Sequence, residues 1–68
     1  MSKYDKLWDY VAESGKDELE LTFDDIDRIA GVPIDHSFLN YKKELLPRGY
    51  EVDHIFMKKG FVRFKRTR

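Results

Sequence analysis

The chain has 68 residues, of which 15% are aromatic and 38% charged, and it contains no cysteine. This length predicts one domain, residues 1–68, with a small core, and the lack of cysteine excludes disulfides and thiolate metal sites. The aromatic content argues against disorder, because large rings supply the apolar surface that a core needs. No apolar run approaches the roughly 20 residues of a membrane span, and the N-terminus lacks the apolar stretch of a signal peptide, so we expect a soluble cytoplasmic protein.

The formal net charge is zero, but the two signs are separated along the chain. Residues 1–41 carry four basic and ten acidic side chains, a net charge of −6. Residues 42–68 carry nine basic and three acidic side chains, a net charge of +6. Two interpretations follow: the basic half binds a polyanionic partner, or the two halves attract each other within one small fold.

Residues 2–15 show the pattern of an amphipathic helix. Ser2 is a candidate N-cap, and Gly15 ends the helix because glycine readily adopts the left-handed conformation found there. Apolar side chains recur at helical spacing and predict one buried stripe, formed by Tyr4, Leu7, Trp8 and Val11. In a core this small, Trp8 is interpreted as a core residue rather than as a platform for a ligand.

A short strand and a second helix are predicted next. Residues 19–22 alternate apolar and polar side chains, as a half-buried strand does. Thr22 suits the N-cap of the helix, with Asp25 in the position of the capping-box acid and Gly31 as the stop. The apolar stripe of this helix is formed by Phe23, Ile26, Ile29 and Ala30.

Three acidic residues, Asp24, Asp25 and Asp27, crowd the first turns of this second helix. Their spacing does not match the Asp-x-Asp-x-Asp-Gly loop of a calcium site. Negative charge is also favoured at a helix N-terminus by the helix dipole. We therefore expect a solvated acidic surface, with no metal and no cofactor.

A third helix is predicted from His36 to Leu46, with Asp35 as its N-cap and Pro47 and Gly49 as its stop. Its buried side is expected to hold Phe38, Tyr41, Leu45 and Leu46, with Leu39 at the margin. The opposite side presents His36, Asn40, Lys43 and Glu44, with Ser37 at the flank. Lys42 falls near the apolar side, where its stem would lie along apolar surface while its charge reaches water.

The last part of the chain, residues 49–68, combines two β-rich runs with many basic side chains. A two-residue turn at Lys59 and Gly60 predicts a hairpin. In that register the pairs are Lys58 with Phe61, Met57 with Val62, Ile55 with Phe64 and Asp53 with Arg66. The predicted core face holds Ile55, Met57, Val62 and Phe64. The outer face holds Val52, His54, Phe56, Arg63 and Lys65.

The order helix, strand, helix, helix, strand, strand predicts an α+β domain of the winged-helix class, in which three helices pack on a small antiparallel sheet. The strand at residues 19–21 would pair with the hairpin, because an isolated hairpin is not stable. The second and third helices would form a helix-turn-helix, with the hairpin as the wing.

Four motifs are spread along most of the chain: Tyr4-Asp5-x-Leu7, Leu21-Thr22-Phe23-x-x-Ile26-x-x-Ile29-x-Gly31, Gly49-Tyr50-x-Val52 and Val62-x-Phe64-x-Arg66. Together they resemble the pattern of a small, poorly characterised prokaryotic domain family. The family usually carries a longer, tryptophan-containing stretch where this chain has residues 40–48. The resemblance implies a winged-helix-like fold, and it implies no activity and no functional residues.

A basic hairpin beside the exposed side of a helix-turn-helix predicts binding of double-stranded DNA. Asparagine can pair with adenine, and lysine reaches guanine or phosphate, so the third helix would read a major groove through His36, Ser37, Asn40 and Lys43. Phosphate neutralisation supplies most non-specific affinity. The wing would provide it through Lys58, Lys59 and Arg63, with Lys65, Arg66 and Arg68 behind them.

The opposite charges of the two halves also favour a protein-interaction module, which would dock a protein partner or a second copy head to tail. We do not expect an enzyme. His36 and His54 are the only histidines, and they fall in different predicted elements. The sequence shows neither a Ser-His-Asp set nor a phosphate-binding glycine loop.

Overall fold

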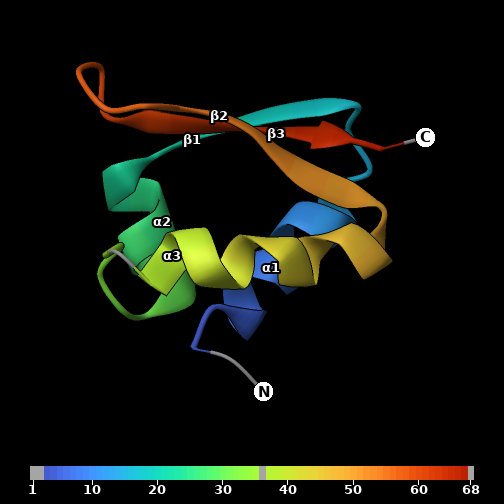
Figure 1. Ribbon diagram of the computed structural model, residues 1–68, viewed down its shortest axis with the longest axis horizontal. Helices are drawn as coiled ribbons and strands as arrows, with labels where there is room; N and C mark the ends of the chain where they lie inside the picture. The colour runs from blue at the N-terminus through green and yellow to red at the C-terminus, as the bar shows by residue number, and fades with distance from the viewer. Residues whose placement is uncertain (1–2, 36, 68) are drawn as a thin grey trace.

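The structure is a computed structural model that describes residues 3–35 and 37–67. The fold is α+β, as predicted, with helices packed on one face of a three-stranded antiparallel sheet (Figure 1). In chain order the elements are α1 (Asp5–Ser14), β1 (Glu18–Thr22), α2 (Phe23–Ala30), α3 (Ser37–Tyr41), the 3₁₀ helix η1 (Lys42–Arg48), β2 (Tyr50–Phe56) and β3 (Phe61–Arg66). The predicted N-cap Ser2 lies outside the described residues, as do His36 and Arg68.

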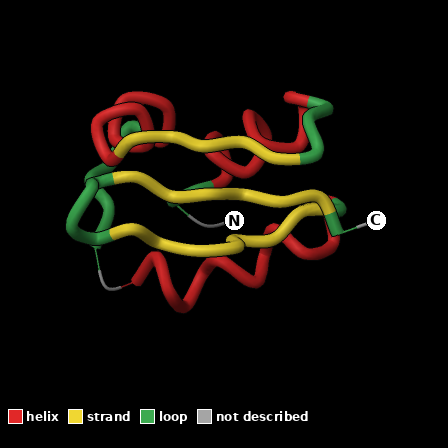
Figure 2. Tube along the Cα trace, turned by 90° about the horizontal axis from the view of Figure 1, so that it is seen from above, coloured by secondary structure: helices red, strands yellow, loops and turns green. Residues whose placement is uncertain are grey.

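The last strand, β3, is the centre of the sheet, with β1 and β2 antiparallel on either side of it. Figure 2 shows the three strands side by side across the helices. On the helix-covered face, Leu19 pairs with Phe64 and Leu21 with Val62. The short strand therefore completes the sheet, as predicted, and it brings the acidic first half of the chain directly beside the basic hairpin.

The predicted stripe of α1 is confirmed, because Tyr4, Leu7, Trp8 and Val11 are all fully buried. The ring of Tyr4 meets the ring of Phe38 edge-on, with centroids 5.4 Å apart, and the ring of Trp8 lies 5.7 Å from Phe38. Such aromatic contacts stabilise a core beyond the area that they bury. They fasten α1 to α3, and they confirm Trp8 as a core residue.

The boundaries of α2 follow the predicted local signals. The Thr22 hydroxyl accepts the N–H of Asp25 at 3.0 Å, and the Asp25 carboxylate accepts the N–H of Thr22 at 3.2 Å, which completes the capping box. Gly31 ends the helix with a φ of 79°, a conformation that is costly for other residues. At the other end of α2, the N–H of Phe23 donates to the carbonyl of Gly60 at 2.9 Å, so the start of the helix also holds the hairpin turn.

The prediction of one continuous third helix is wrong. The α-helix ends at Tyr41, and the chain continues as η1, which contains Pro47. Residues three apart share a side of a 3₁₀ helix, so Leu46 lines up with exposed Lys43 and is 50% exposed instead of buried. Glu44, predicted on the opposite side, accepts a hydrogen bond from the Trp8 indole at 3.3 Å. Phe38 and Leu45 are buried as expected.

The predicted register of the hairpin is also wrong. The turn spans four residues, Met57–Gly60, and the observed pairs are Phe56 with Phe61, Ile55 with Val62, Val52 with Phe64 and Tyr50 with Arg66. A bulge between Val52 and His54 adds a residue to β2 and shifts its alternation, so that Tyr50 and Val52 join Ile55 on the core side. Met57 is not in the core and is 73% exposed.

Candidate functional site

The outward side of α3 and η1 carries part of the predicted DNA-reading set. Asn40 and Lys43 are exposed. Ser37 has a structural role instead, because its N–H donates to the Asp35 carboxylate at 2.9 Å and its hydroxyl donates to the same oxygen. The Asp35 carboxylate therefore satisfies the N–H of the first residue of α3. The fourth predicted residue, His36, lies outside the described residues.

Asp35 connects the start of α3 to the segment before α1. The Lys3 ammonium lies 2.8 Å from its carboxylate, and the Tyr4 hydroxyl donates to it at 3.3 Å. The hydrogen bond from Lys3 is the main reason why the pKa of the Asp35 carboxyl lies well below its usual range, and the hydrogen bond from the Ser37 hydroxyl is the second reason. The carboxylate is thus ionised at neutral pH, and it fixes the position of the helix.

Lys58 and Lys59 lie in the exposed turn of the hairpin. The turn is closed by the N–H of Gly60, which donates to the carbonyl of Phe56 at 2.8 Å. A second backbone hydrogen bond, from the N–H of Phe23 to the carbonyl of Gly60, joins the turn to the start of α2. Both lysines therefore project from a turn whose backbone is fastened to the rest of the domain.

Arg63 and Lys65 lie on the outer face of the sheet, where acidic neighbours balance them. The guanidinium of Arg63 is 3.0 Å from the carboxylate of Glu20 and 3.9 Å from that of Asp53. It also lies 5.0 Å from the centre of the Phe56 ring. Lys65 stands between two acidic residues in the strand register, Glu18 on β1 and Glu51 on β2. These two side chains make the outer face a mixed surface rather than a basic one.

Arg66 points to the opposite face of the sheet from Arg63 and Lys65. Its guanidinium is 3.4 Å from the Asp17 carboxylate and donates to the carbonyl of Gly15. It also approaches the ring of Tyr50, its partner in the register. Arg66 therefore fastens the end of β3 to the loop after α1. Among the predicted residues that the structure describes, Arg66 therefore lies on a different face of the sheet from Arg63 and Lys65.

Ion pairs join the two oppositely charged halves of the chain: Arg48 with Asp9, Arg63 with Glu20 and Arg66 with Asp17. Attraction within the fold, one of the two interpretations of the charge pattern, accounts for these arginines. Seven exposed lysines differ from them, because they have no salt bridge within residues 3–35 and 37–67. Lys42, Lys43, Lys58 and Lys59 belong to η1 or to the hairpin turn, and the other three are Lys6, Lys16 and Lys65.

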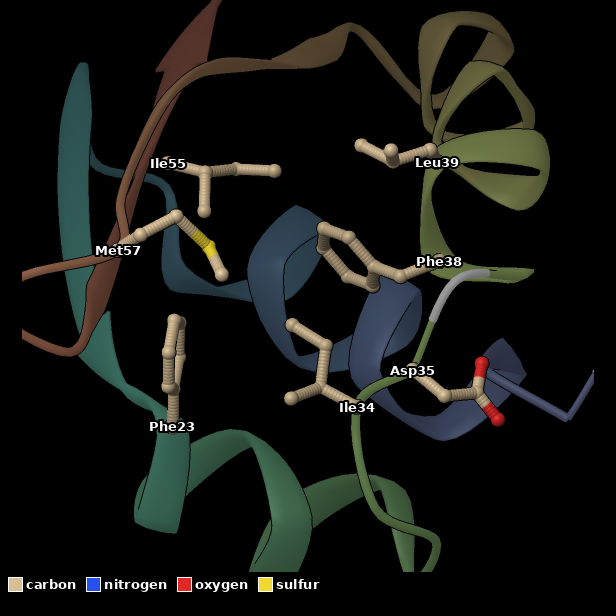
Figure 3. A pocket seen from close by; sticks show the side chains of 7 residues that line it. All are labelled: Phe23, Ile34, Asp35, Phe38, Leu39, Ile55 and Met57. Carbon is tan, nitrogen blue, oxygen red and sulfur yellow. The ribbon is translucent and has the colours of Figure 1, made fainter.

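Between α3 and the hairpin lies an apolar groove that the sequence did not reveal. Its volume is about 330 Å³, and its lining comes from Phe23, Ile34, Asp35, Phe38, Leu39, Ile55 and Met57. In Figure 3 the apolar side chains converge on the cavity, while the Asp35 carboxylate points away from it. The pattern had placed Met57 in the core and Leu39 at the margin of a helix, and only the packed fold brings these two side chains to one opening.

No protein-family model, curated protein or solved structure matches this chain. In the described part of the chain, no group of three or more histidine, aspartate or glutamate side chains could hold a metal ion. The same residues include no helix that is long and apolar enough to cross a membrane.

Proposed function

We propose that this chain is a winged-helix domain that binds double-stranded DNA through η1, the outward side of α3 and the hairpin turn. The order of its elements and the pairing of β1 with β3 support this assignment. In such a domain α2 and α3 form the helix-turn-helix, and the β2–β3 hairpin is the wing. The resemblance in sequence motifs points to the same class.

The single observation that carries the proposal is that two pairs of exposed lysines, on η1 and in the hairpin turn, have no salt bridge among the described residues. Lys42 and Lys43 lie on η1, Lys58 and Lys59 lie in the turn, and Asn40 is exposed on α3 just before η1. Lysines that are not neutralised within the protein can replace the counterions of DNA phosphates. An exposed asparagine on the helix can pair with adenine.

We expect the arginines and Lys65 to contribute less to DNA binding than the lysines of η1 and the turn. Arg63 and Arg66 already neutralise carboxylates within the domain, and Lys65 stands between two glutamates. About four lysine–phosphate contacts give a slope of log affinity against log salt near −3.6. We expect a dissociation constant in the range of roughly 10⁻⁴ to 10⁻⁶ M that is typical of non-specific binding.

The test is an NMR titration of the chain with a short mixed-sequence duplex at low and moderate salt. Chemical shifts should move at residues 40–43 and 57–60 and should diminish steeply with salt. Replacing Lys58 and Lys59 by glutamine should weaken binding about tenfold, since each lost phosphate contact removes a released counterion. Replacing Lys6 and Lys16, which are exposed elsewhere, is the matched control. Equal losses in both variants, or no shifts at all, would rule out the proposed DNA-binding surface.

A protein-interaction role is the second candidate function, and the apolar groove favours it. A duplex presents its charge on a convex backbone and carries no side chain that could fill a cavity. Leu39 and Met57 at the opening of the groove would then remain in water. DNA binding alone therefore leaves this part of the surface without a partner.

A further inference from the structure

We propose that the groove between α3 and the hairpin is the docking site for an acidic protein segment with large apolar side chains. This inference is independent of DNA binding, although the two ligands would share lysines. It rests on three features of the described residues: the shape of the groove, the exposure of its rim and the charge beside it.

The shape of the groove suits side chains rather than a cofactor. Phe23, Ile34, Phe38 and Ile55 form its interior, and they come from the start of α2, the loop before α3, α3 itself and β2. Because these elements are fastened to one another through the core, the groove is preformed. A volume of about 330 Å³ lies at the lower end of ligand pockets, which range over roughly 300–1,000 Å³. We expect it to take one or two large apolar side chains.

The rim of the groove is apolar and exposed. Leu39 is 52% exposed on the α3 side, and Met57 is 73% exposed on the hairpin side. Figure 3 shows their side chains on opposite sides of the cavity. A segment lying across the groove would cover both of them and exclude water from the interior. Methionine is a flexible side chain that adapts to varied apolar surfaces, which suits such a rim.

Positively charged side chains follow both rim residues in the chain. Lys58 directly follows Met57, and Lys42 and Lys43 begin η1 just after α3, which carries Leu39. The lysines of the turn and of η1 have no salt bridge among the described residues, as noted above. The only acidic side chain in the lining, Asp35, is paired with Lys3. The partner that complements this surface carries carboxylates next to its apolar side chains.

The test uses the full chain and a short fluorescent peptide in which acidic residues surround a leucine and a phenylalanine one helical turn apart. Fluorescence anisotropy measures binding. Leu39→Ala should weaken binding about tenfold, because the residue loses its apolar contact with the peptide. Leu46→Ala is the matched control, since Leu46 is 50% exposed but does not line the groove. Replacing Lys43 and Lys58 by glutamine should also weaken binding, and rising salt should do the same.

Any one of three results with the peptide would overturn the inference: no binding of the peptide, equal binding of a peptide with serine in both apolar positions, or equal losses for Leu39→Ala and Leu46→Ala. A Leu39-dependent rise in mass with protein concentration, without peptide, would overturn it by assigning the groove to a second copy. Circular dichroism of each variant checks that the fold is intact. Duplex binding is measured on the same variants, so that peptide binding without duplex binding removes only the DNA proposal, and the reverse removes only this inference.

Discussion

The two ends of the β2–β3 hairpin are both basic, but their basic side chains have different surroundings. At the base, away from the turn, Arg63 and Arg66 contact carboxylates on or just before β1. At the turn, Lys58 and Lys59 extend beyond the end of β1, whose last residue pairs with Phe61. The difference arises because an acidic strand runs beside one end of the hairpin and stops short of the other.

This difference separates structural charge from available charge. The strand β1 carries Glu18 and Glu20 on the outer face, directly opposite Lys65 and Arg63. Opposite charges across a strand pair stabilise the sheet, and they lower the potential that a phosphate would meet. The density of lysine and arginine along residues 58–66 therefore overstates the basic surface of the hairpin. Within residues 42–67, the basic side chains that no carboxylate balances lie in the hairpin turn and on η1.

The largest expected effect is on stability, and it distinguishes the apolar residues at the two ends of the hairpin. Phe64→Ala should lower the free energy of unfolding by about 3–5 kcal/mol, because Phe64 is fully buried at the base. Met57→Ala at the turn should change it by no more than about 0.5 kcal/mol. Urea denaturation followed by tryptophan fluorescence measures both.

A domain of this size is only marginally stable, so Phe64→Ala is expected to be largely unfolded. Val62→Ala removes less from the same buried face, about 2 kcal/mol, and keeps a measurable transition. If Met57→Ala were as destabilising as Val62→Ala, the turn would be part of the core and the contrast between the two ends would fail.

Local signals in the sequence were sufficient for the first half of the fold. The capping box of Thr22 and Asp25 and the glycine at Gly31 each depend on residues within one turn of the helix, so a linear pattern contains them. The stripe of α1 follows from helical spacing alone. The predictions of these features are correct because no contact with a distant part of the chain competes with the local signals.

The second half depended on contacts that no linear pattern contains. The bulge after Val52 lets residues on both sides of it face the core, and the pattern without a bulge placed Met57 inside. The 3₁₀ winding of η1 brings Glu44 to the indole of Trp8, which lies far away in the chain. The register with the bulge places Met57 in the turn, and the packed fold brings it to the same groove as Leu39. The candidate site could therefore be predicted as two basic segments but not as a cavity between them.

An intermediate effect should distinguish the charges at the two ends. Arg63→Gln should lower the free energy of unfolding by about 0.5–1 kcal/mol, because it removes the contact with Glu20 at a partly exposed site. Lys58→Gln should leave stability unchanged within about 0.5 kcal/mol. In duplex titrations the order of the two variants should reverse, so that Lys58→Gln loses more affinity for DNA than Arg63→Gln. Equal losses of duplex binding would show that the ion pair at the base does not withhold Arg63 from DNA.

The smallest effect concerns Asp35, which holds the helix on one side of the groove while the hairpin forms the other. Its pKa is lower in the folded chain than in the unfolded chain, where a carboxyl of this type titrates near about 3.9. The contribution to stability is therefore complete above that value and is lost as the pH falls through the folded pKa. Between about pH 5 and pH 2, the wild-type chain should lose more stability than Asp35→Asn, which has no carboxyl to titrate. Parallel curves for the wild type and Asp35→Asn would mean that the contacts with Lys3 and Ser37 do not stabilise the start of α3 in solution.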